Sequence, residues 1–545
     1  MTNEEIALAY HEATKHHFNR YARSMGYLDW ANQPDPFRRY LGAKRFLLPL
    51  VANDVTPSYE SLYREQPPAL PLTLESLSVF FECSMAISAW KEYQGSRWAL
   101  RCNPSSGNLH PTEAYVLMGG LPGLSDEATL WHYASDGHAL ERRAHTHAEL
   151  PESVFLVGLA SVFWREAWKY GERAFRYCQH DTGHAIAALA FAARALGWRM
   201  RRLDDVSDDL AEKLLGLDRT SEFHVEELEH AECLLLVDTR AEAVSEHQEI
   251  DFEFVADSLK FEARPNVLSA DHAHWSIIDA VAQATRRTAT QPLPRDENYL
   301  QQVPAIVGDH DCALSFRAIA KQRRSAVAMD GESDLGVEAF YRTLGRALPE
   351  SASGLFSAIP GRPLVHLALF VHRVRGLRPG LYFLVRYHEQ EGAIRNTMQR
   401  ERAWTRAEGC PEGLHLYRIE EGDCRSLAAQ VSCTQEIAGT GAFSLGMIAE
   451  FEGPIREHGA AQYRRLFWEA GFIGQILYLE AEAAALRATG IGCYFDDPVH
   501  EVFGLEGERY QSMYHFTIGG PVEDTRLTTL QPYFPERMGR SGWIE

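Results

Sequence analysis

Two stretches of the chain repeat each other without a gap: RYCQHDTGHAIAALAFAARALGW at residues 176–198 and RRLFWEAGFIGQILYLEAEAAAL at residues 464–486. A single offset of 288 residues relates them, and it carries Gly183 onto Gly471 and, further on, Asp208 onto Asp496. Each copy then runs into an apolar segment that ends in Asp-Thr-Arg, at residues 238–240 and 524–526. A period this long is not that of a solenoid repeat, so it predicts a duplicated domain.

The repeated stretches are rich in Ala and Leu and apolar on nearly all sides, which predicts helices that are buried from several directions. Runs dense in β-branched and aromatic residues predict strands, among them EAYVLM (113–118), SVFLVGLA (153–160), LVHLALFVHRV (364–374) and GLYFLVRY (380–387). Each half is therefore expected to be an α+β sandwich. Two helices too apolar to face water should pack against each other, so we expect an intramolecular pseudo-dimer. The predicted domains are residues 1–257 and 301–545, joined by a linker at 258–300.

Composition narrows the class of protein. The chain has 545 residues and a formal net charge of −21, which argues against nucleic acid or an anionic membrane as its main partner. Its nine cysteines are scattered and form no CxxC pair, so neither a metal cluster nor a disulfide framework is expected. We find no signal-peptide pattern at the N-terminus and no run near the ~18 apolar residues of a membrane span. These features predict a cytoplasmic location.

Each half contains one polar element that the other lacks. Arg323, Arg324 and Ser325 would make a good phosphate grip, because guanidinium forks bind phosphate in a bidentate manner. At an offset of 279, the first half has Lys44, Arg45 and Phe46 there instead. Conversely, the first half has the polar elbow NPSSGNLHP (103–111) before a strand, where the second half has SAIPGRP (357–363). Taken alone, an arginine pair is more often a solvated helix face.

These elements resemble those of the nitroreductase superfamily of FMN flavoproteins, and the resemblance covers both halves. The resemblance implies a flavin at the interface, with its phosphate held by Arg323, Arg324 and Ser325 from one half. It implies that Pro104, Ser105, Ser106 and Asn108 of the other half line the flavin ring. It further assigns Gly490, Ile491 and Gly492 to a loop near the ring, and Arg526 to the phosphate. One intact and one degraded FMN site per chain are expected.

The first half is most similar to the SagB/ThcOx-type dehydrogenases, which oxidise azoline rings in ribosomal peptides to azoles. The resembling residues are WREAWKYGERAFRYCQHDTGH (164–184) and RCNPSSGNLHPTEAYV (101–116). That branch uses an adjacent Lys-Tyr pair as its base, which would be Lys169 and Tyr170 here. The chemistry is consistent, because loss of a hydride to flavin requires loss of a proton from the neighbouring atom. Without the likeness, the pair would be read as ordinary exposed residues.

Other histidines and cysteines are assigned less specific roles. His180 and His184 have the i, i+4 spacing of a zinc helix, but their counterparts Trp468 and Phe472 are apolar, so we predict packing sites and no metal. The histidines of HEATKHHF (11–18) are expected at the surface of an amphipathic helix. Cys493 is expected to be a small packing residue, because nothing cationic flanks it in the sequence.

The sequence therefore predicts an FMN-dependent oxidoreductase, and two chemistries stay open. It could dehydrogenate a C–N or C–S bond in a peptide or small metabolite, or it could reduce nitro or quinone compounds with NAD(P)H as co-substrate. A duplicated chain that kept the fold as a non-catalytic binding protein is the alternative from a different class. A small molecule or peptide is the expected partner, and further association of chains is undetermined.

Overall fold

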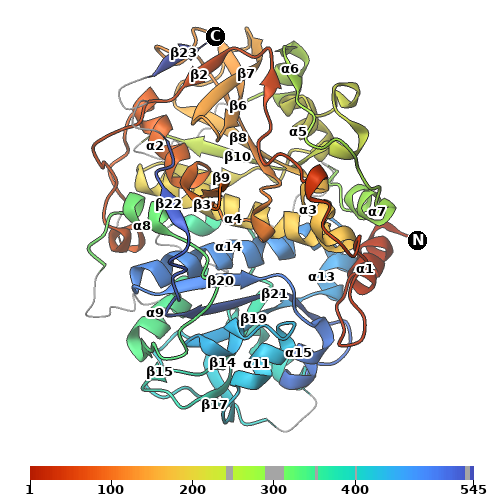
Figure 1. The fold of residues 1–545 in the computed structure, drawn as a ribbon, viewed down its shortest axis with the longest axis vertical. Helices are drawn as coiled ribbons and strands as arrows, with labels where there is room; N and C mark the ends of the chain where they lie inside the picture. The colour runs from red at the N-terminus through yellow and green to blue at the C-terminus, as the bar shows by residue number, and fades with distance from the viewer. Residues whose placement is uncertain are drawn as a thin grey trace.

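The computed structural model describes residues 1–64, 66–240, 250–288, 312–349, 354–398, 402–533 and 541–544 (Figure 1). We call residues 1–288 the first half and residues 312–544 the second half. The helices of the first half are α1 (Asn3–Ala13), α2 (Leu74–Ser84), α3 (Phe163–Tyr170), α4 (Ala174–Ala195), α5 (Asp208–Leu215), α6 (Phe252–Ser258) and α7 (Ser276–Ala284). Those of the second half are α8 (Phe316–Gln322), α9 (Val337–Arg346), α10 (Glu391–Thr397), α11 (Arg425–Val431), α12 (Ile437–Thr440), α13 (Glu452–His458), α14 (Gln462–Ala483) and α15 (Asp496–Phe503).

The first half forms strands β1 (Tyr40–Leu41), β2 (Arg45–Leu47), β3 (Ile87–Tyr93), β4 (Ser96–Arg101), β5 (Thr112–Met118), β6 (Ala128–Ala134), β7 (Ala139–Thr146), β8 (Val154–Val162), β9 (Arg199–Arg202), β10 (Glu229–Asp238), β11 (Lys260–Phe261) and β12 (Arg264–Pro265). The second half forms β13 (Leu335–Gly336), β14 (Val365–Val371), β15 (Val374–Arg375), β16 (Gly380–Leu384), β17 (Thr405–Arg406), β18 (Leu416–Glu421), β19 (Phe443–Glu450), β20 (Arg487–Ile491), β21 (Tyr510–Gly519), β22 (Thr528–Leu530) and β23 (Gly542–Ile544).

Each half is built on one antiparallel sheet, and the two sheets have the same strand order. In the first it runs β7-β6-β5-β8-β10-β9, and in the second β18-β16-β14-β19-β21-β20. In each half, the helix before strand β10 or β21 ends at an equivalent glycine. Gly216 after α5 and Gly504 after α15 have left-handed φ values of 71° and 68°. The predicted duplication of an α+β domain is therefore confirmed.

The two long helices lie between the sheets and pack against each other, as Figure 1 shows for α4 and α14. Every residue of α4 is buried. A Cβ on Gly183 would lie 2.3 Å from the carbonyl oxygen of Trp468, and a Cβ on Gly471 would lie 2.2 Å from that of His180. The helix backbones are thus in direct contact at the two glycines that the repeat superimposes. The contact between the two helices joins the halves into the intramolecular pseudo-dimer that the sequence predicted.

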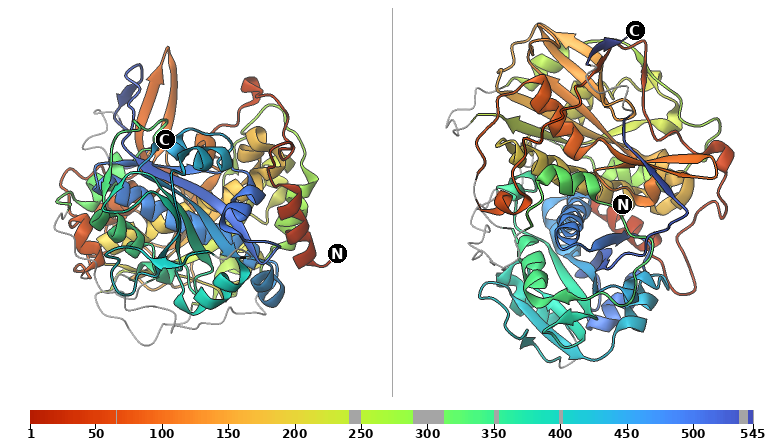
Figure 2. Two further views of the ribbon diagram at one scale, coloured as in Figure 1. Left: turned by 90° about the horizontal axis from the view of Figure 1, so that it is seen from below. Right: turned by 60° about the vertical axis from the view of Figure 1, so that its left-hand side comes forward.

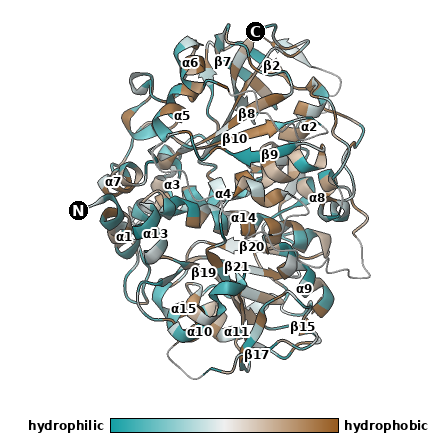
Figure 3. Ribbon diagram, turned by 180° about the vertical axis from the view of Figure 1, so that it is seen from behind, coloured by the Kyte–Doolittle hydropathy of each residue, from teal (hydrophilic) through white to brown (hydrophobic). Residues whose placement is uncertain are grey.

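Hydropathy is consistent with this layering. Figure 3 colours β8 and β10 brown, in keeping with their burial in the sheet of the first half. The edge strand β9 is teal, because its sequence is Arg-Met-Arg-Arg. Among the described residues, no helix is both long and apolar enough to cross a membrane.

Segments near the chain ends cross from one half to the other, as two further views also show (Figure 2). Strand β22 pairs with β3, and β23 pairs with β2, so the C-terminal segment completes sheets of the first half. In the opposite direction, His11 of α1 hydrogen-bonds Tyr463 and Gln511 of the second half, at 3.3 Å each. The two halves are therefore interlocked as well as packed.

The predicted linker is only partly described. Its start contributes β11, which pairs with β7, and β12, which pairs with β1. Helix α7 comes next, and the predicted end of the linker at residue 300 lies outside the described residues. The domain boundaries at 257 and 300 stay predictions.

Candidate functional site

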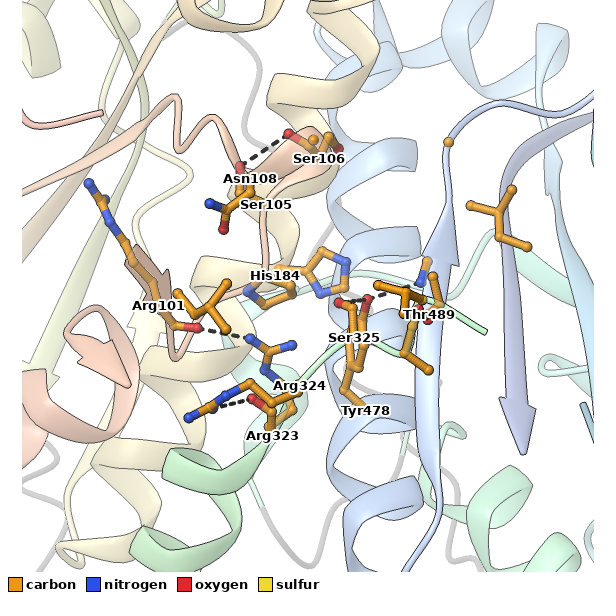
Figure 4. A pocket seen from close by; sticks show the side chains of 18 of the residues that line it. Arg101, Ser105, Ser106, Asn108, His184, Arg323, Arg324, Ser325, Tyr478 and Thr489 are labelled. Atoms are coloured by element: carbon orange, nitrogen blue, oxygen red, sulfur yellow. Dashed lines mark hydrogen bonds between the residues drawn. The ribbon is translucent and has the colours of Figure 1, made fainter. Parts of the chain in front are cut away.

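A cavity of about 480 Å³ opens between the halves. Eleven of the thirteen residues predicted for the site line it: Pro104, Ser105, Ser106, Asn108, Tyr170, Arg323, Arg324, Ser325, Gly490, Ile491 and Gly492. Figure 4 shows residues of the elbow and of the arginine pair around the same space. Elements 200 or more residues apart in sequence thus meet at one place.

The elbow is held in shape by its own polar groups. The hydroxyl of Ser105 accepts a hydrogen bond from the backbone N–H of His110 at 2.8 Å. The hydroxyl of Ser106 donates to Asp181 at 3.0 Å, and the amide of Asn108 donates to the carbonyl of Ala99 at 2.9 Å. These side chains therefore fix a loop that contains successive left-handed residues, and the loop wall faces the cavity.

One end of the cavity is basic. Arg323 donates to the carbonyls of Cys102 at 3.2 Å and Arg101 at 2.8 Å, and its guanidinium lies over the Tyr478 ring. Within the described part of the chain, its buried Nη1 has no hydrogen-bond partner. Arg324 donates to the hydroxyl of Ser88 at 3.0 Å, and burial lowers its pKa to about 10. A buried and a half-buried cation side by side, the first with a spare donor, favour an anionic ligand.

The end of β20 and the residue after it form the facing wall: Gly490 and Ile491, predicted in a loop, are the last residues of the strand, and Gly492 follows it. Close contacts require both glycines. A Cβ on Gly490 would lie 2.1 Å from the hydroxyl of Tyr514, and a Cβ on Gly492 would lie 2.2 Å from the Tyr177 ring. The Tyr478 hydroxyl accepts the N–H of Gly490 at 3.0 Å and shares a 2.8 Å hydrogen bond with Ser325. The loop and the Arg-Arg-Ser element are thus connected through one tyrosine.

Lys169 and Tyr170 lie beside the elbow at the end of α3. A Cβ on Gly107 would be 2.6 Å from the Tyr170 hydroxyl and 3.1 Å from the Lys169 Nζ, and Gly107 has a φ of 59°. Tyr170 lines the cavity, whereas Lys169 is not among the residues that line it and has its Nζ over the Tyr170 ring, 5.1 Å from the ring centre. Burial and the charge of Glu166 raise the pKa of Tyr170.

Two buried carboxyl groups accompany this pair, and the sequence analysis missed both. Asp181 accepts the N–H and the hydroxyl of Ser106, each at 3.0 Å, and burial raises its pKa to about 7 against these hydrogen bonds. Burial raises the pKa of Glu166, and the charge of Asp181 raises it further. Neither oxygen of Glu166 has a hydrogen-bond partner among the described residues. Only the fold shows that α3 and α4 bring these acids to the elbow.

Arg526 lies at the margin of the cavity, next to the lining residues Asp524 and Leu527. It is exposed, pairs with Asp524 at 2.8 Å, and is not among the residues that line the cavity. Its predicted phosphate contact stays a prediction. Other residues that line the cavity and were missed are Lys91, Arg101, Tyr177, His184, Tyr478, Arg487 and Tyr514. Tyr177, His184, Tyr478 and Arg487 lie in or next to the repeated segments, and Arg101 adjoins the elbow, whereas Lys91 in β3 had no signal in the sequence.

His180 and His184 pack in the interface, as their apolar counterparts predicted. His180 hydrogen-bonds the carbonyl of Met513 at 2.8 Å and stacks on the Tyr514 ring, with centroids 4.0 Å apart. His184 contacts the Tyr514 hydroxyl at 3.3 Å. Within the described residues, no three His, Cys, Asp or Glu side chains form a potential metal site.

Two expectations about the N-terminal histidines and Cys493 are wrong. His11 and His16 are buried, because α1 packs against the second half instead of facing solvent. Cys493 is close to His16 and to the charge of Arg173, both of which come from distant parts of the chain. Sequence neighbours could not show the His16 ring or the Arg173 cation.

The solved structures include one that matches nearly the whole chain. It is a candidate nitroreductase from Anabaena variabilis, 23% identical, with a TM-score of 0.67 over 95% of this chain and 99% of that one. The chain has a nitroreductase-like fold. No protein-family model and no curated protein matches the sequence.

Partial matches cover about two fifths of the chain. The Escherichia coli microcin synthetase complex McbBCD, with truncated pro-MccB17 bound, has a chain that is 16% identical, with coverage of 37% and 70% and a TM-score of 0.28. A candidate nitroreductase from Exiguobacterium sibiricum in complex with FMN is 15% identical, with coverage of 39% and 90% and a TM-score of 0.23.

In this nitroreductase-like fold the duplication creates a second, symmetry-related position, but there the space is much smaller. The cavity found there has a volume of about 160 Å³. At the 288 offset, Arg202 and Asp204 take the places of Gly490 and Gly492, and they bind each other at 2.7 Å. Arg465 takes the place of Tyr177, and Arg287 adds a 3.2 Å contact to Asp204. Charged side chains and ion pairs thus occupy the positions at which the first cavity has glycines, and the cavity there is smaller.

Proposed function

We propose that the protein is an FMN-dependent oxidoreductase that binds one flavin per chain in the larger cavity. The observation that carries the proposal is the composite wall: the Arg-Arg-Ser element comes from the second half and the polar elbow from the first. A volume of about 480 Å³ lies within the range of roughly 300–1,000 Å³ typical of ligand pockets. The FMN complex of the Exiguobacterium sibiricum protein is in keeping with this assignment.

The residues present fit such a cofactor. The buried Arg323 has an Nη1 without a partner among the described residues, which suits a phosphate oxygen. The absent Cβ atoms of Gly490 and Gly492 let the side chains of Tyr514 and Tyr177 lie directly against this wall, and both tyrosines line the cavity in which a flat ring would bind. When bound, FMN would supply hydride transfer.

The proton chemistry belongs to the chain's own residues. Because its pKa is raised, Tyr170 keeps its proton at neutral pH and serves as a hydrogen-bond donor. Asp181 is then a group that can accept a proton next to the elbow, beside the Lys169–Tyr170 pair that we propose as the catalytic residues. Asp181, with a pKa of about 7, is suited to exchange protons near neutral pH. This arrangement supports dehydrogenation of a C–N or C–S bond as in the SagB/ThcOx-type enzymes, with a peptide or small-metabolite substrate.

The first test measures flavin content. Purified protein, reconstituted with FMN, should be yellow with about one FMN per chain. Replacing Arg323 with Ala removes a buried cation, and loss of a charge-assisted hydrogen bond of about 1.5–3 kcal/mol should raise the Kd for FMN roughly ten- to hundredfold. Arg287→Ala, at the smaller cavity, is the matched control and should leave that Kd unchanged. Protein that cannot be reconstituted, or that holds two FMN per chain, would refute the composite site.

A second test separates the two chemistries. Under anaerobic conditions, NADPH should not bleach the flavin of a substrate dehydrogenase. Rapid bleaching would replace our proposal with an NAD(P)H-dependent reductase of nitro or quinone compounds. A yellow protein that neither NADPH nor any C–N or C–S ring compound bleaches, even though dithionite does, would indicate a binding protein that kept the fold.

A further inference from the structure

Two cysteine thiols meet at the edge of the larger cavity. Cys493 follows the glycine loop and lines the cavity, and Cys433 lies in the turn after α11. The N–H of Phe495 donates to the carbonyl of Val431 at 2.8 Å, which holds the two segments side by side. The Gln435 amide adds hydrogen bonds of 2.9 Å to the carbonyls of Cys493 and Ser432. In this arrangement the Cys433 thiol is close enough to Cys493 to interact with it, and both cysteines are free thiols.

The groups around the pair favour a thiolate at Cys493. His16 Nδ1 accepts the backbone N–H of Ala22 at 2.9 Å, so in the neutral ring the proton is on Nε2, free to donate to the Cys493 sulfur. Arg173 donates to the Gly492 carbonyl at 3.3 Å, and it also binds Asp496. The hydrogen bond from Cys433, then the one from His16 and the Arg173 charge lower the pKa of Cys493.

Cys433 is in the opposite state. Its hydrogen bond to Cys493 and its burial raise its pKa, so it stays a thiol next to a thiolate. The Tyr21 side chain is near it, and Cys433 itself has a left-handed φ of 53° in the turn. A low-pKa thiol beside a protonated partner is the arrangement of an attacking and a resolving cysteine.

We propose that Cys433 and Cys493 form a dithiol–disulfide couple that exchanges with small disulfides entering the cavity. The Cys493 thiolate attacks one sulfur of the small disulfide, which breaks that S–S bond, forms a mixed disulfide and releases the first thiolate. Cys433 then loses its proton to that leaving group and attacks the Cys493 sulfur, which releases the second thiolate to be protonated from solvent. Two protein thiols are oxidised, and one small disulfide is reduced to two thiols.

The protein disulfide would join the turn after α11 to the loop that forms one cavity wall. Oxidation would therefore fix the position of residues 490–493 relative to residues 432–435. Other close cysteines lack this setting: Cys83 and Cys102 are both buried, and burial raises the pKa of each. Cys410 is half-buried like the pair, but its thiol donates to the Leu414 carbonyl at 3.1 Å and burial raises its pKa, so it is a matched control.

The test uses the full-length protein and glutathione. After incubation with mixtures of oxidised and reduced glutathione, free thiols are blocked with N-ethylmaleimide and the digest is examined by mass spectrometry. We expect a linked peptide that contains Cys433 and Cys493, lighter by two hydrogens than the two free peptides. It should be present in Cys410→Ser and absent in Cys433→Ser and Cys493→Ser. Cys433→Ser should instead accumulate glutathione on Cys493.

A second measurement needs no variant. At pH 6, iodoacetamide should label Cys493 at least tenfold faster than Cys410 in the same sample. If no glutathione mixture yields the linked peptide, or if the two cysteines are labelled at equal rates, the couple does not exist. Neither readout requires flavin or substrate, so this failure would be distinct from failure of the proposed function.

Discussion

The contact between α4 and α14 gives a quantitative prediction for Gly183→Ala. The added Cβ would lie 2.3 Å from the Trp468 carbonyl oxygen and 2.8 Å from its Cα. Both are backbone atoms, so no change of rotamer relieves the clash, and the helices must separate by about 1 Å to restore ordinary van der Waals contact. Overpacking of this kind lowers the free energy of unfolding by about 1–3 kcal/mol, and we expect a cost near the upper end of this range for Gly183→Ala. The better helix propensity of alanine returns at most about 1 kcal/mol.

We therefore expect Gly183→Ala to lower the free energy of unfolding by about 1–2 kcal/mol, measured by guanidinium denaturation followed by circular dichroism. Gly392→Ala is the control, because Gly392 lies in α10 with open space where its Cβ would be. That variant should be unchanged, or more stable by up to about 1 kcal/mol. If Gly183→Ala is as stable as Gly392→Ala, the helices do not cross in backbone contact, and the pseudo-dimer argument fails.

Three further outcomes are expected at the site. Because the pKa of Asp181 in the folded protein is raised to about 7, the stability that its protonated form provides is complete below pH 4 and is lost as the pH rises toward 7. Between pH 4 and 8 the wild type should therefore lose up to about 4 kcal/mol of unfolding free energy that Asp181→Asn does not lose. If the unfolding free energies of the two proteins change in parallel with pH, the expectation is wrong. Gly492→Ala should weaken FMN binding at least tenfold in fluorescence titrations, because the Cβ of the new alanine would enter the Tyr177 ring. Unchanged binding would mean that this loop does not approach the flavin. Arg526→Ala should leave the Kd for FMN within twofold of wild type, because the side chain is exposed and paired with Asp524; a tenfold increase would restore its predicted phosphate role.

The sequence by itself determined the duplication and the features that depend on local pattern. The 288-residue offset, with Gly183 on Gly471 and two continuous apolar helices, predicted tandem α+β domains and their packing, because such helices have no polar face to turn toward water. The polar elbow and the Arg-Arg-Ser element could be singled out for a related reason. Each occurs in one copy only, so the comparison of copies isolates them without knowledge of the fold.

Only the tertiary structure decided which side chains surround them. Asp181 and Glu166 do not stand out in the sequence, and burial between α3, α4 and the elbow gives their carboxyl groups raised pKa values. Cys493 has no cationic neighbour in sequence, yet Arg173 reaches it from the start of α4, and His16 reaches it because the N-terminal segment crosses to the other half. Electrostatic environment depends on distances in space and on exclusion of water, and neither quantity is encoded in the spacing of residues along the chain.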